Sequence, residues 1–390
     1  MLKGRMWMHR TYRSFQSTVL LVTSFLLLPL VSSAEPAAQK GFMRFPDLHE
    51  SRVVFTSSSD LWVGDVAGGT AHRLTAHPGE ERFPKFSPDG KWIAFSGQYN
   101  GSEDVYVMPA GGGQPRQLTY HPSYEHVAGW TPDGQILFRR RSLPPWRGWT
   151  MYTVDPKGDY PERIADARIG YLSYEPGGDR VALVPEYQAF TNWRRYQGGE
   201  AETIWVGTLD PARFENISQW KGNEGHPMWA DDGRIYHVSD SLGRANLWSM
   251  LPDGSDLRRE TDLDEFDVLW PSMDGNRIVF QYGVELRLFD LESRTVVPLE
   301  INAPTDLYVA RTRFVEGSKY VDAWSLSDNG RTVLAESRGE VFTMPVKAEG
   351  LIRQWTFSSD SREKLPVFLP EGDGAIGMVT DESGEERIVT

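Results

Sequence analysis

The sequence predicts an all-β protein, a six-bladed β-propeller of four-stranded blades that is followed by the first blades of a second, incomplete β-propeller. Three observations support this fold class. A Pro-Asp-Gly turn between two short apolar stretches recurs along the chain, and four strand-like stretches follow one another in each copy. Asp89, Asp133 and Gly177 take the same turn position at a constant spacing of 44 residues. A period of this length with four strands per unit is typical of propeller blades.

The clearest copy begins with residues 86–95. They predict two strands joined by a tight turn at Pro88-Asp89-Gly90, because proline presets φ and glycine tolerates positive φ. Residues 104–107 predict the third strand. A glycine turn follows, and residues 116–119 predict the fourth strand.

The repeats give the chain an expected order of parts. These parts are a signal peptide at residues 1–34, a linker at 35–41, a six-bladed β-propeller at 42–301, a connecting segment at 302–319 and the start of a second β-propeller at 320–390. Two insertions in the first propeller, at residues 139–149 and 185–200, are predicted to be loops. The last unit stops where its third strand is due, and a sheet cut there has an unpaired edge. The sequence is therefore interpreted as a fragment that is truncated after Thr390.

Residues 1–34 have the pattern of an export signal. A basic start precedes an apolar stretch at residues 19–31, and small residues follow up to Ala34. The apolar stretch is short for crossing a bilayer, although an uncleaved anchor is the alternative. We expect cleavage after Ala34 and a periplasmic or secreted protein with no membrane association afterwards.

Composition excludes several classes of function. The formal net charge is −13, and residues 1–34 contain four basic and no acidic residues, so the rest of the chain is more acidic still. Such a chain repels phosphate groups, which argues against nucleic-acid binding. The chain has no cysteine, which excludes disulfides, a thiol nucleophile and lipidation of a cysteine after the signal.

No residue set for catalysis, a metal or a cofactor stands out. The chain has no Gly-x-Ser-x-Gly nucleophile motif. Residues 121–126 resemble a metal motif, but the spacing is one residue too long and Pro122 disfavours the helix that such motifs need. The acidic run at residues 262–267 lacks the glycine and the distal glutamate of a calcium loop. We expect no catalytic residue, no metal and no cofactor in this chain.

Two basic and aromatic stretches in the insertions are the candidate substrate-binding residues. They are Arg139, Arg140, Arg141, Trp193, Arg194, Arg195 and Tyr196. Guanidinium groups on loops of an acidic protein are suited to holding peptide carboxylates. The alternative is that these side chains pack between domains and pair with the protein's own acids, and the sequence leaves both open.

The order of motifs resembles the amino-terminal part of the tricorn proteases. The residues that carry the resemblance lie at 42–47, 60–63, 74–80, 87–95, 129–134, 204–206, 266–271 and 336–340, together with the more specific insertion Trp-Arg-Arg-Tyr-Gln-Gly-Gly at 193–199. The resemblance covers residues 42–390. It implies a six-bladed propeller followed by a seven-bladed one, and then a helical domain, a PDZ domain and the domains that hold a serine-protease active site.

The resemblance implies a function for the chain as a part of a longer protein. We expect an exported, non-catalytic propeller region that guides or filters peptides for proteolysis by downstream domains of a serine peptidase, a hydrolase. The expected partners are peptides or unfolded polypeptide segments and the downstream PDZ and protease domains, and a homo-oligomer is left open. The alternative is a self-standing periplasmic propeller that binds proteins, similar to the propeller of the Tol system.

The first ring is expected to close without a shared blade. Unit one supplies its own inner strand around residues 43–45 and its own outer strand at 71–75, and unit six ends with its own outer strand at 295–299. Blades one and six are therefore predicted to meet through side-chain packing alone, as the resemblance also implies.

Overall fold

The computed structural model describes residues 41–390 apart from 142–147, 188–193, 221, 306–313, 348–349, 359–360 and 371–373. The predicted signal peptide and almost all of the predicted linker lie outside the described residues. The chain divides into two compact units, Met1–Asp306 and Leu307–Thr390. The described part is almost entirely β-structure, with one short 3-10 helix at Gly317–Tyr320.

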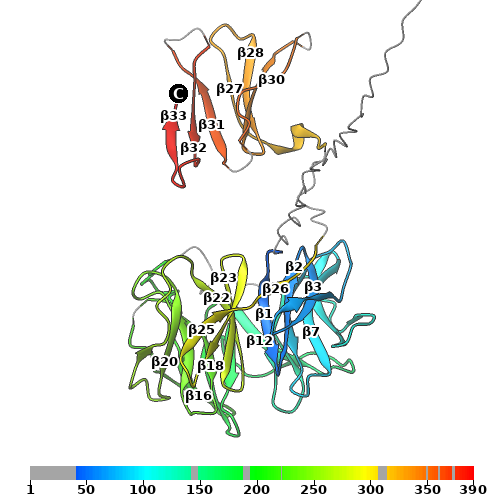
Figure 1. The fold of residues 1–390 in the computed structure, drawn as a ribbon, viewed down its shortest axis with the longest axis vertical. Helices are drawn as coiled ribbons and strands as arrows, with labels where there is room; N and C mark the ends of the chain where they lie inside the picture. The colour runs from blue at the N-terminus through cyan, green and yellow to red at the C-terminus, as the bar shows by residue number, and fades with distance from the viewer. Residues whose placement is uncertain are drawn as a thin grey trace, which may run out of the picture. The chain divides into compact units, whose positions relative to one another are not determined.

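The first unit contains six four-stranded antiparallel sheets around a central axis (Figure 1). Sheets one to three consist of β1 (Arg44–His49), β2 (Arg52–Ser57), β3 (Asp60–Asp65) and β5 (His72–Arg73); β6 (Glu81–Phe86), β7 (Trp92–Asn100), β8 (Ser102–Pro109) and β9 (Arg116–Gln117); and β10 (Glu125–Trp130), β11 (Ile136–Arg141), β12 (Trp149–Val154) and β13 (Glu162–Arg163). Sheets four to six consist of β14 (Tyr171–Tyr174), β15 (Arg180–Val184), β16 (Trp205–Leu209) and β17 (Ala212–Asn216); β18 (Glu224–Trp229), β19 (Ile235–Ser239), β20 (Asn246–Met250) and β21 (Arg258–Arg259); and β22 (Val268–Asp274), β23 (Arg277–Tyr282), β24 (Glu285–Asp290) and β25 (Thr295–Pro298). Within each sheet the strands follow chain order, and the first strand is the inner one because all six first strands line a central pocket.

The second unit contains two sheets. One has four strands, β27 (Val321–Leu326), β28 (Thr332–Ser337), β29 (Glu340–Pro345) and β30 (Arg353–Gln354), and the other has three, β31 (Glu363–Phe368), β32 (Ile376–Thr380) and β33 (Arg387–Val389). The predicted all-β class and the four-stranded sheet as its unit are therefore confirmed.

The repeated Pro-Asp-Gly turn forms the first hairpin of a sheet, as predicted. In sheet two, Gly90 has a φ of +64° and donates its N–H to the Ser87 carbonyl at 2.8 Å. The Asp89 carboxylate accepts hydrogen bonds from the Ser87 hydroxyl at 2.7 Å and from the Lys91 N–H at 3.2 Å. These bonds fix the turn locally, and the register of the two flanking strands follows from it.

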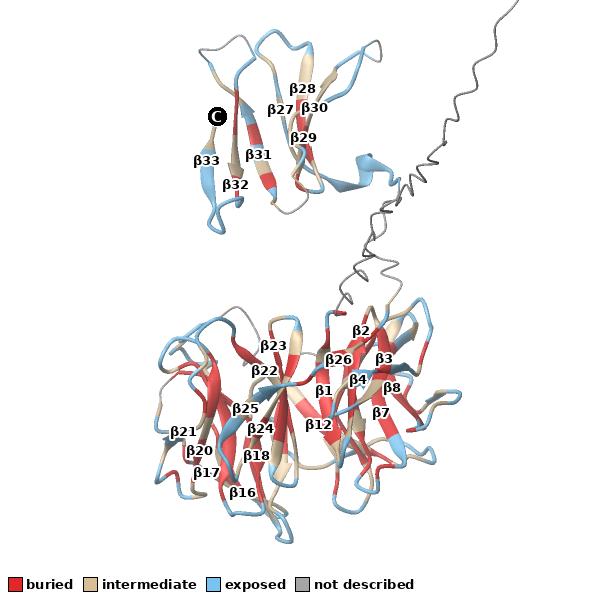
Figure 2. Ribbon diagram, in the orientation of Figure 1, coloured by how far each residue is buried: buried red, intermediate tan, exposed pale blue. Residues whose placement is uncertain are grey.

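Neighbouring sheets pack face to face through apolar side chains. Figure 2 shows that much of the length of their strands is buried. Between sheets one and six, Val53 and Phe55 pack in one cluster with Val279 and Leu286. Each large side chain buried in this way contributes roughly 1.5–3 kcal/mol of transfer free energy. Much of the core of the ring therefore lies between the sheets.

A buried polar contact ties the outer end of one sheet to the inner strand of the next. The Thr75 hydroxyl accepts the Leu61 N–H at 2.8 Å and donates to the Glu81 carboxylate at 2.9 Å. The Val105 N–H donates to the Thr119 hydroxyl at 2.9 Å, which repeats the first half of this contact one sheet later. Burial raises the pKa of Glu81 to about 7, although hydrogen bonds from Tyr99 and Thr75 oppose the shift.

The ring does not close by side-chain packing alone, so that prediction is wrong. A short strand after the sixth sheet, β26 (Ile301–Asn302), pairs in parallel with β4 (Gly69–Thr70) of the first blade. The N–H of Gly69 donates to the Glu300 carbonyl at 2.9 Å, and the N–H of Ala71 donates to the Asn302 carbonyl at 2.8 Å. We call this pairing of β26 with β4 the clasp.

The physical reason for the clasp is an apolar alternation in residues 299–303. Leu299, Ile301 and Ala303 are all buried, so this segment lies as a strand against the first blade instead of leaving the ring. The seam also holds a backbone hydrogen bond from Met43 N–H to the Val284 carbonyl at 3.1 Å.

Candidate functional site: an axial pocket with an aromatic floor

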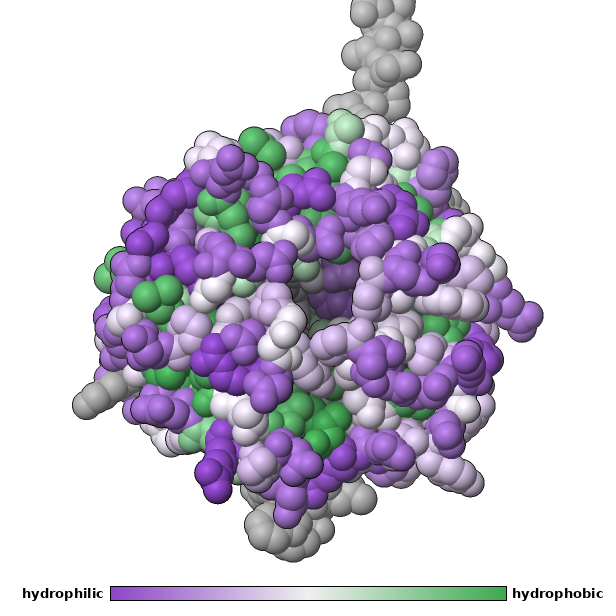
Figure 3. All heavy atoms as spheres, turned by 90° about the horizontal axis from the view of Figure 1, so that it is seen from below, coloured by the Kyte–Doolittle hydropathy of each residue, from purple (hydrophilic) through white to green (hydrophobic). Residues whose placement is uncertain are grey.

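The candidate site is a pocket on the axis of the first unit. Figure 3 shows a hollow at the centre of one face of the ring. The cavity measures about 340 Å³, and residues from the inner strands of all six sheets line it. The lining combines hydroxyl groups, charged groups and the side chains of Trp130, Met228 and Met273, which suits a ligand with both polar and apolar parts.

Four inner strands direct a ring-bearing side chain toward the axis by the same local device. Phe45, Phe83, His226 and Trp270 each precede a proline, and each has a φ between 51° and 55°. The ladder to the second strand shifts register at each of these pairs. Proline cannot donate to the ladder, and a bulge re-aims the side chains of a strand. In each of these four strands, the residue before the proline therefore leaves the regular pairing with the second strand, and its ring is re-aimed.

These side chains meet on the axis and form a floor to the pocket. The ring centroids of Phe45, Phe83 and Trp270, from three different sheets, lie 4.6–5.2 Å apart. On the other side His226 stacks on Tyr171, with centroids 3.9 Å apart. The cavity that remains among the described residues measures only about 20 Å³, space for about one water molecule.

His226 is held in its neutral form in this floor. Its Nε2 lies 2.8 Å from the carbonyl oxygen of Pro271, so Nε2 carries the hydrogen and donates it. Complete burial lowers the pKa of His226 well below its usual value, and the charges of Lys85 and Arg139 add to the effect. His226 thus contributes a neutral aromatic ring to the floor.

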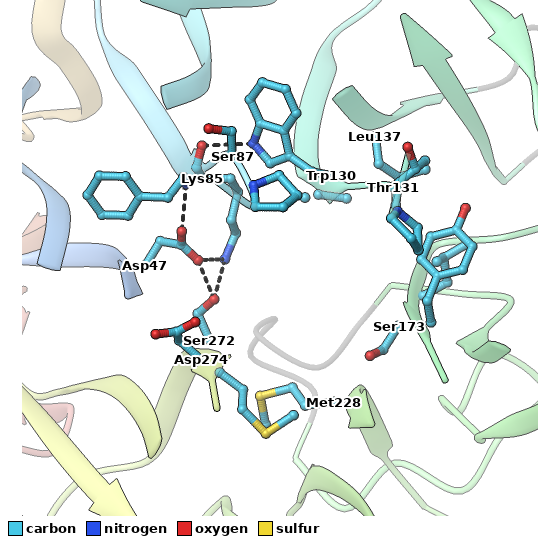
Figure 4. Close-up of a pocket in the computed structure, with 18 of the residues that line it drawn as sticks. Asp47, Lys85, Ser87, Trp130, Thr131, Leu137, Ser173, Met228, Ser272 and Asp274 are labelled. Atoms are coloured by element: carbon cyan, nitrogen blue, oxygen red, sulfur yellow. Dashed lines mark hydrogen bonds and ion pairs between the residues drawn. The ribbon is translucent and has the colours of Figure 1, made fainter. Parts of the chain in front are cut away.

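A polar cluster stands at the wall of the pocket, where sheets one, two and six meet. Figure 4 shows the Lys85 side chain between Asp47 and Ser272. Lys85 Nζ lies 3.1 Å from Asp47 Oδ1 and 2.9 Å from Ser272 Oγ, and the Ser272 hydroxyl donates to the same carboxylate. The second Asp47 oxygen accepts the Phe86 N–H at 2.7 Å. A serine that donates to a carboxylate beside a paired lysine lacks the free base that activates a nucleophile, so we interpret this cluster as structural.

Arg139, Arg140 and Arg141 do not lie in an inserted loop, and this part of the prediction is wrong. They are the last three residues of strand β11. Arg139 is 2% exposed, its guanidinium carbon lies 3.4 Å from the centroid of the Tyr187 ring, and it donates to the Gly170 carbonyl at 3.3 Å. Arg140 pairs with the buried Glu125 at 2.5 Å. For these two residues the observed contacts are those of the packing alternative.

The second predicted group is partly described. Trp193 lies outside the described residues. Arg194 pairs with Asp267 at 2.6 Å, and the backbone N–H of Arg195 donates to Asp240 at 2.6 Å. Tyr196 is half-buried. Tyr187, which also lies in the second insertion, stacks on Arg139 of the first stretch. The binding role of all seven residues stays a prediction.

The sequence reasoning missed the residues that form the floor. The pairs Phe45-Pro46, Phe83-Pro84 and Trp270-Pro271 recur at the same place in three inner strands, and this repetition was the available signal. Within the described ranges no group of three or more histidine, aspartate or glutamate side chains could hold a metal ion. No helix in the described part of the chain has the length and apolarity needed to cross a membrane.

The fold and the pocket define a β-propeller that presents an axial pocket. Residues 40–295 match the family described as the tricorn protease N-terminal beta propeller domain. The chain belongs to this family, and the predicted resemblance is confirmed.

The similar proteins are longer than this chain. A tricorn protease homolog from Saccharolobus solfataricus is 31% identical over 364 residues, which cover 90% of this chain and 33% of that protein. Tricorn protease homolog 1 from Streptomyces coelicolor is 31% identical over 384 residues, which cover 91% of this chain and 33% of that protein. The crystal structure of the tricorn protease matches with a TM-score of 0.68 at 22% identity, over 90% of this chain and 35% of that chain, and shows the fold. This chain therefore spans about a third of the length of its relatives.

Proposed function

We propose that this chain is the non-catalytic, peptide-handling propeller of a tricorn-like serine protease, in which it guides or filters peptides for proteolysis by other domains. The observation that carries the proposal is the axial pocket, to which all six inner strands contribute. Membership of the tricorn propeller family supports the link to a protease. The self-standing binding propeller has no comparable observation in its favour.

The pocket suits a short stretch of a peptide. A volume of about 340 Å³ falls at the lower end of the range for small-ligand sites, so it accommodates one or two side chains. With the aromatic floor in place, a peptide that enters from this face is held and not passed through the ring. Passage along the axis would require Phe45, Phe83 and Trp270 to separate.

Filling the pocket should lower peptide processing by the full-length protease. Gly129 lines the pocket, and a Cβ added there meets no atom within 4 Å. We expect Gly129→Phe to reduce kcat/KM for a peptide of about fifteen residues by about tenfold, since about 1.4 kcal/mol of lost binding gives this factor. Hydrolysis of a small amide substrate should stay unchanged, because such a substrate does not need the propeller.

The matched control is Gly111→Phe. Gly111 is exposed, has equally open surroundings and lies away from the pocket lining. This variant should process both substrates at the wild-type rate. Equal rates for Gly129→Phe and Gly111→Phe on the long peptide would reject the axial pocket as the peptide-handling site.

We also propose that the protein is exported and that residues 1–34 are removed, which makes it periplasmic or secreted. The basic, apolar and small-residue order of this segment supports the proposal. Amino-terminal sequencing of the protein recovered from its native host should therefore begin at Glu35, and Ala34→Arg should block cleavage because the site requires a small residue. Recovery of the wild-type chain with its first 34 residues in the cytoplasmic fraction would contradict export.

A further inference from the structure

Sheet four ends in a longer outermost strand than most of the other sheets. In sheets one, two, three and five the outermost strand has two residues, whereas β17 has five. β17 is the last strand of its sheet, on the outer side of the ring (Figure 2). In sheet six the outermost strand has four residues but ends in Pro298, which cannot donate to another strand. A long edge strand presents a row of unpaired backbone groups, which natural proteins usually avoid.

The backbone groups of β17 that face its free edge follow from the ladder to β16. Just beyond the first pair of this ladder, the N–H of Ile217 donates to the Ile204 carbonyl at 3.0 Å. Hydrogen-bonded pairs alternate in an antiparallel ladder, so the backbone groups of Glu215 and Arg213 also point toward β16. The residues whose N–H and C=O groups point outward are therefore Ala212, Phe214 and Asn216.

β17 is held to its sheet by one side chain. Phe214 is half-buried and packs against the core cluster around sheet four. Its ring lies over Gly207, the residue opposite on β16, where an added Cβ would be 2.8 Å from the ring. Successive side chains alternate between the faces of a strand, so Arg213 and Glu215 project from the other face. The edge is thus a fixed strand that carries two charges on one side.

These two charges have no counterpart within the described part of the chain. Arg213 and Glu215 are both exposed, and neither makes an ion pair with another described residue. Their neighbours across the ladder are Thr208 and Val206, which carry no charge. One positive and one negative group therefore stand two residues apart on an otherwise unpaired edge.

This arrangement is complementary to a second copy of itself. In a two-fold antiparallel pairing centred on Phe214, Arg213 of each copy faces Glu215 of the other, so two pairs of opposite charges form. Phe214 then faces its own counterpart and Ala212 faces Asn216, so outward backbone groups meet outward backbone groups. A pairing centred on Arg213 or on Glu215 sets that charge against its own copy, which is unfavourable.

We propose that the free edge of β17 pairs with the same edge of a second copy of this chain and joins the two fourth sheets into one continuous sheet. Backbone hydrogen bonds supply the affinity, and the two charge pairs fix the register and exclude the alternatives. The contact is small, so the dimer is a weak and reversible one. The net charge of −13 opposes association, but salt screens this repulsion beyond about 8 Å under physiological conditions. The inference does not rest on the proposed function.

Sedimentation velocity of the full chain tests the pairing. At about 0.15 M salt, the wild type should shift from monomer to dimer as its concentration rises from roughly 5 to 500 µM. Arg213→Glu and Glu215→Arg should each weaken dimerisation by at least about tenfold, because each variant sets two pairs of like charges against each other. Both positions are exposed, so both variants should fold.

Mixing the two variants separates the proposed register from a general effect of charge. In a mixed dimer of Arg213→Glu with Glu215→Arg, both contacts again join opposite charges, so association should recover to within about threefold of the wild type. The double variant Arg213→Glu/Glu215→Arg should recover in the same way. The matched control is Glu162→Arg in β13, an exposed position on the outermost strand of sheet three, which should dimerise as the wild type does.

Hydrogen exchange gives a second measure of the register. Exchange of the outward amides, those of Ala212, Phe214 and Asn216, should slow as the protein concentration is raised. The amides of Arg213 and Glu215 should be protected at every concentration, because they bond within the sheet. A wild type that stays monomeric over the whole range, dimerisation that both charge reversals leave unchanged, or a mixture of the two variants that fails to associate would each overturn the proposal.

Discussion

Replacing Ile301 with alanine should lower the free energy of unfolding of the first unit by roughly 2–5 kcal/mol. Ile301 is almost fully buried and lies over Gly64, where an added Cβ would be 3.3 Å from two Ile301 methyl carbons. The substitution leaves a cavity at the clasp, where β26 pairs with β4 of the first blade. The lost free energy of unfolding therefore weakens the closure of the ring and not one sheet by itself.

Urea denaturation and hydrogen exchange measure this effect. The amides of Gly69 and Ala71, which donate across the clasp, should be protected in the wild type and should exchange faster in Ile301→Ala. Val297→Ala is the matched control, because Val297 lies four residues earlier in β25 and is 48% exposed. It should change stability by less than about 0.5 kcal/mol. Unchanged protection of both amides in Ile301→Ala would show that the clasp does not hold the ring.

Replacing His237 with leucine should remove a large part of the acid sensitivity of the first unit. His237 lies in β19 with 0% exposure, and a hydrogen bond with the Ile235 backbone opposes the effect of burial on its pKa only in part. Burial lowers the pKa of His237 to about 4, against 6.5 for an ordinary histidine. His237 therefore becomes protonated below about pH 6.5 in the unfolded chain, but only below about pH 4 in the folded chain.

This difference in proton uptake determines the direction and the size of the change in unfolding free energy with pH. The stability that depends on neutral His237 is complete above pH 6.5 and declines as the pH falls toward 4, by roughly 3 kcal/mol in total. In His237→Leu the free energy of unfolding should decline less steeply over this range. Parallel curves of unfolding free energy against pH for the two proteins would contradict the prediction.

Glu81→Gln provides a comparison, because Glu81 makes the unfolding free energy depend on pH in the opposite direction. The pKa of Glu81 is raised to about 7, chiefly by burial, so the folded chain keeps a proton that the unfolded chain loses above about pH 4.5. The associated stability is present below pH 4.5 and is lost as the pH rises through 7. Because the two groups act in opposite directions between pH 4.5 and 6.5, each offsets part of the other in the wild type, and the single variants reveal each contribution.

The regular part of the fold was predictable because it depends on local chemistry. The Pro-Asp-Gly turns and the 44-residue spacing specify hairpins and sheets without reference to distant residues. The position of Arg139 was not predictable in this way. A run of three arginines suggests a loop, but the ring of Tyr187, 48 residues later, and the Gly170 carbonyl make burial of the Arg139 guanidinium favourable.

The floor of the pocket and the clasp were missed for related reasons. Phe45 and Trp270 are 225 residues apart, and their contact depends on the positive φ before each proline as well as on closure of the ring. The clasp has an apolar alternation in residues 299–303, but Pro304 and the polar residues beside it resemble a linker. Both features bring together residues that lie far apart in the sequence, so no local sequence pattern predicts their contact.

The order of elements along the chain gives the clasp a mechanical role. β26 is the last described strand before Asp306, where the first unit ends. Tension applied to the chain beyond that residue reaches the two clasp hydrogen bonds before it reaches any strand of sheet six. The parallel pair is only two residues long, so little backbone pairing resists that load before it reaches sheet six. The mechanical integrity of the ring is thereby coupled to whatever pulls on the following segment.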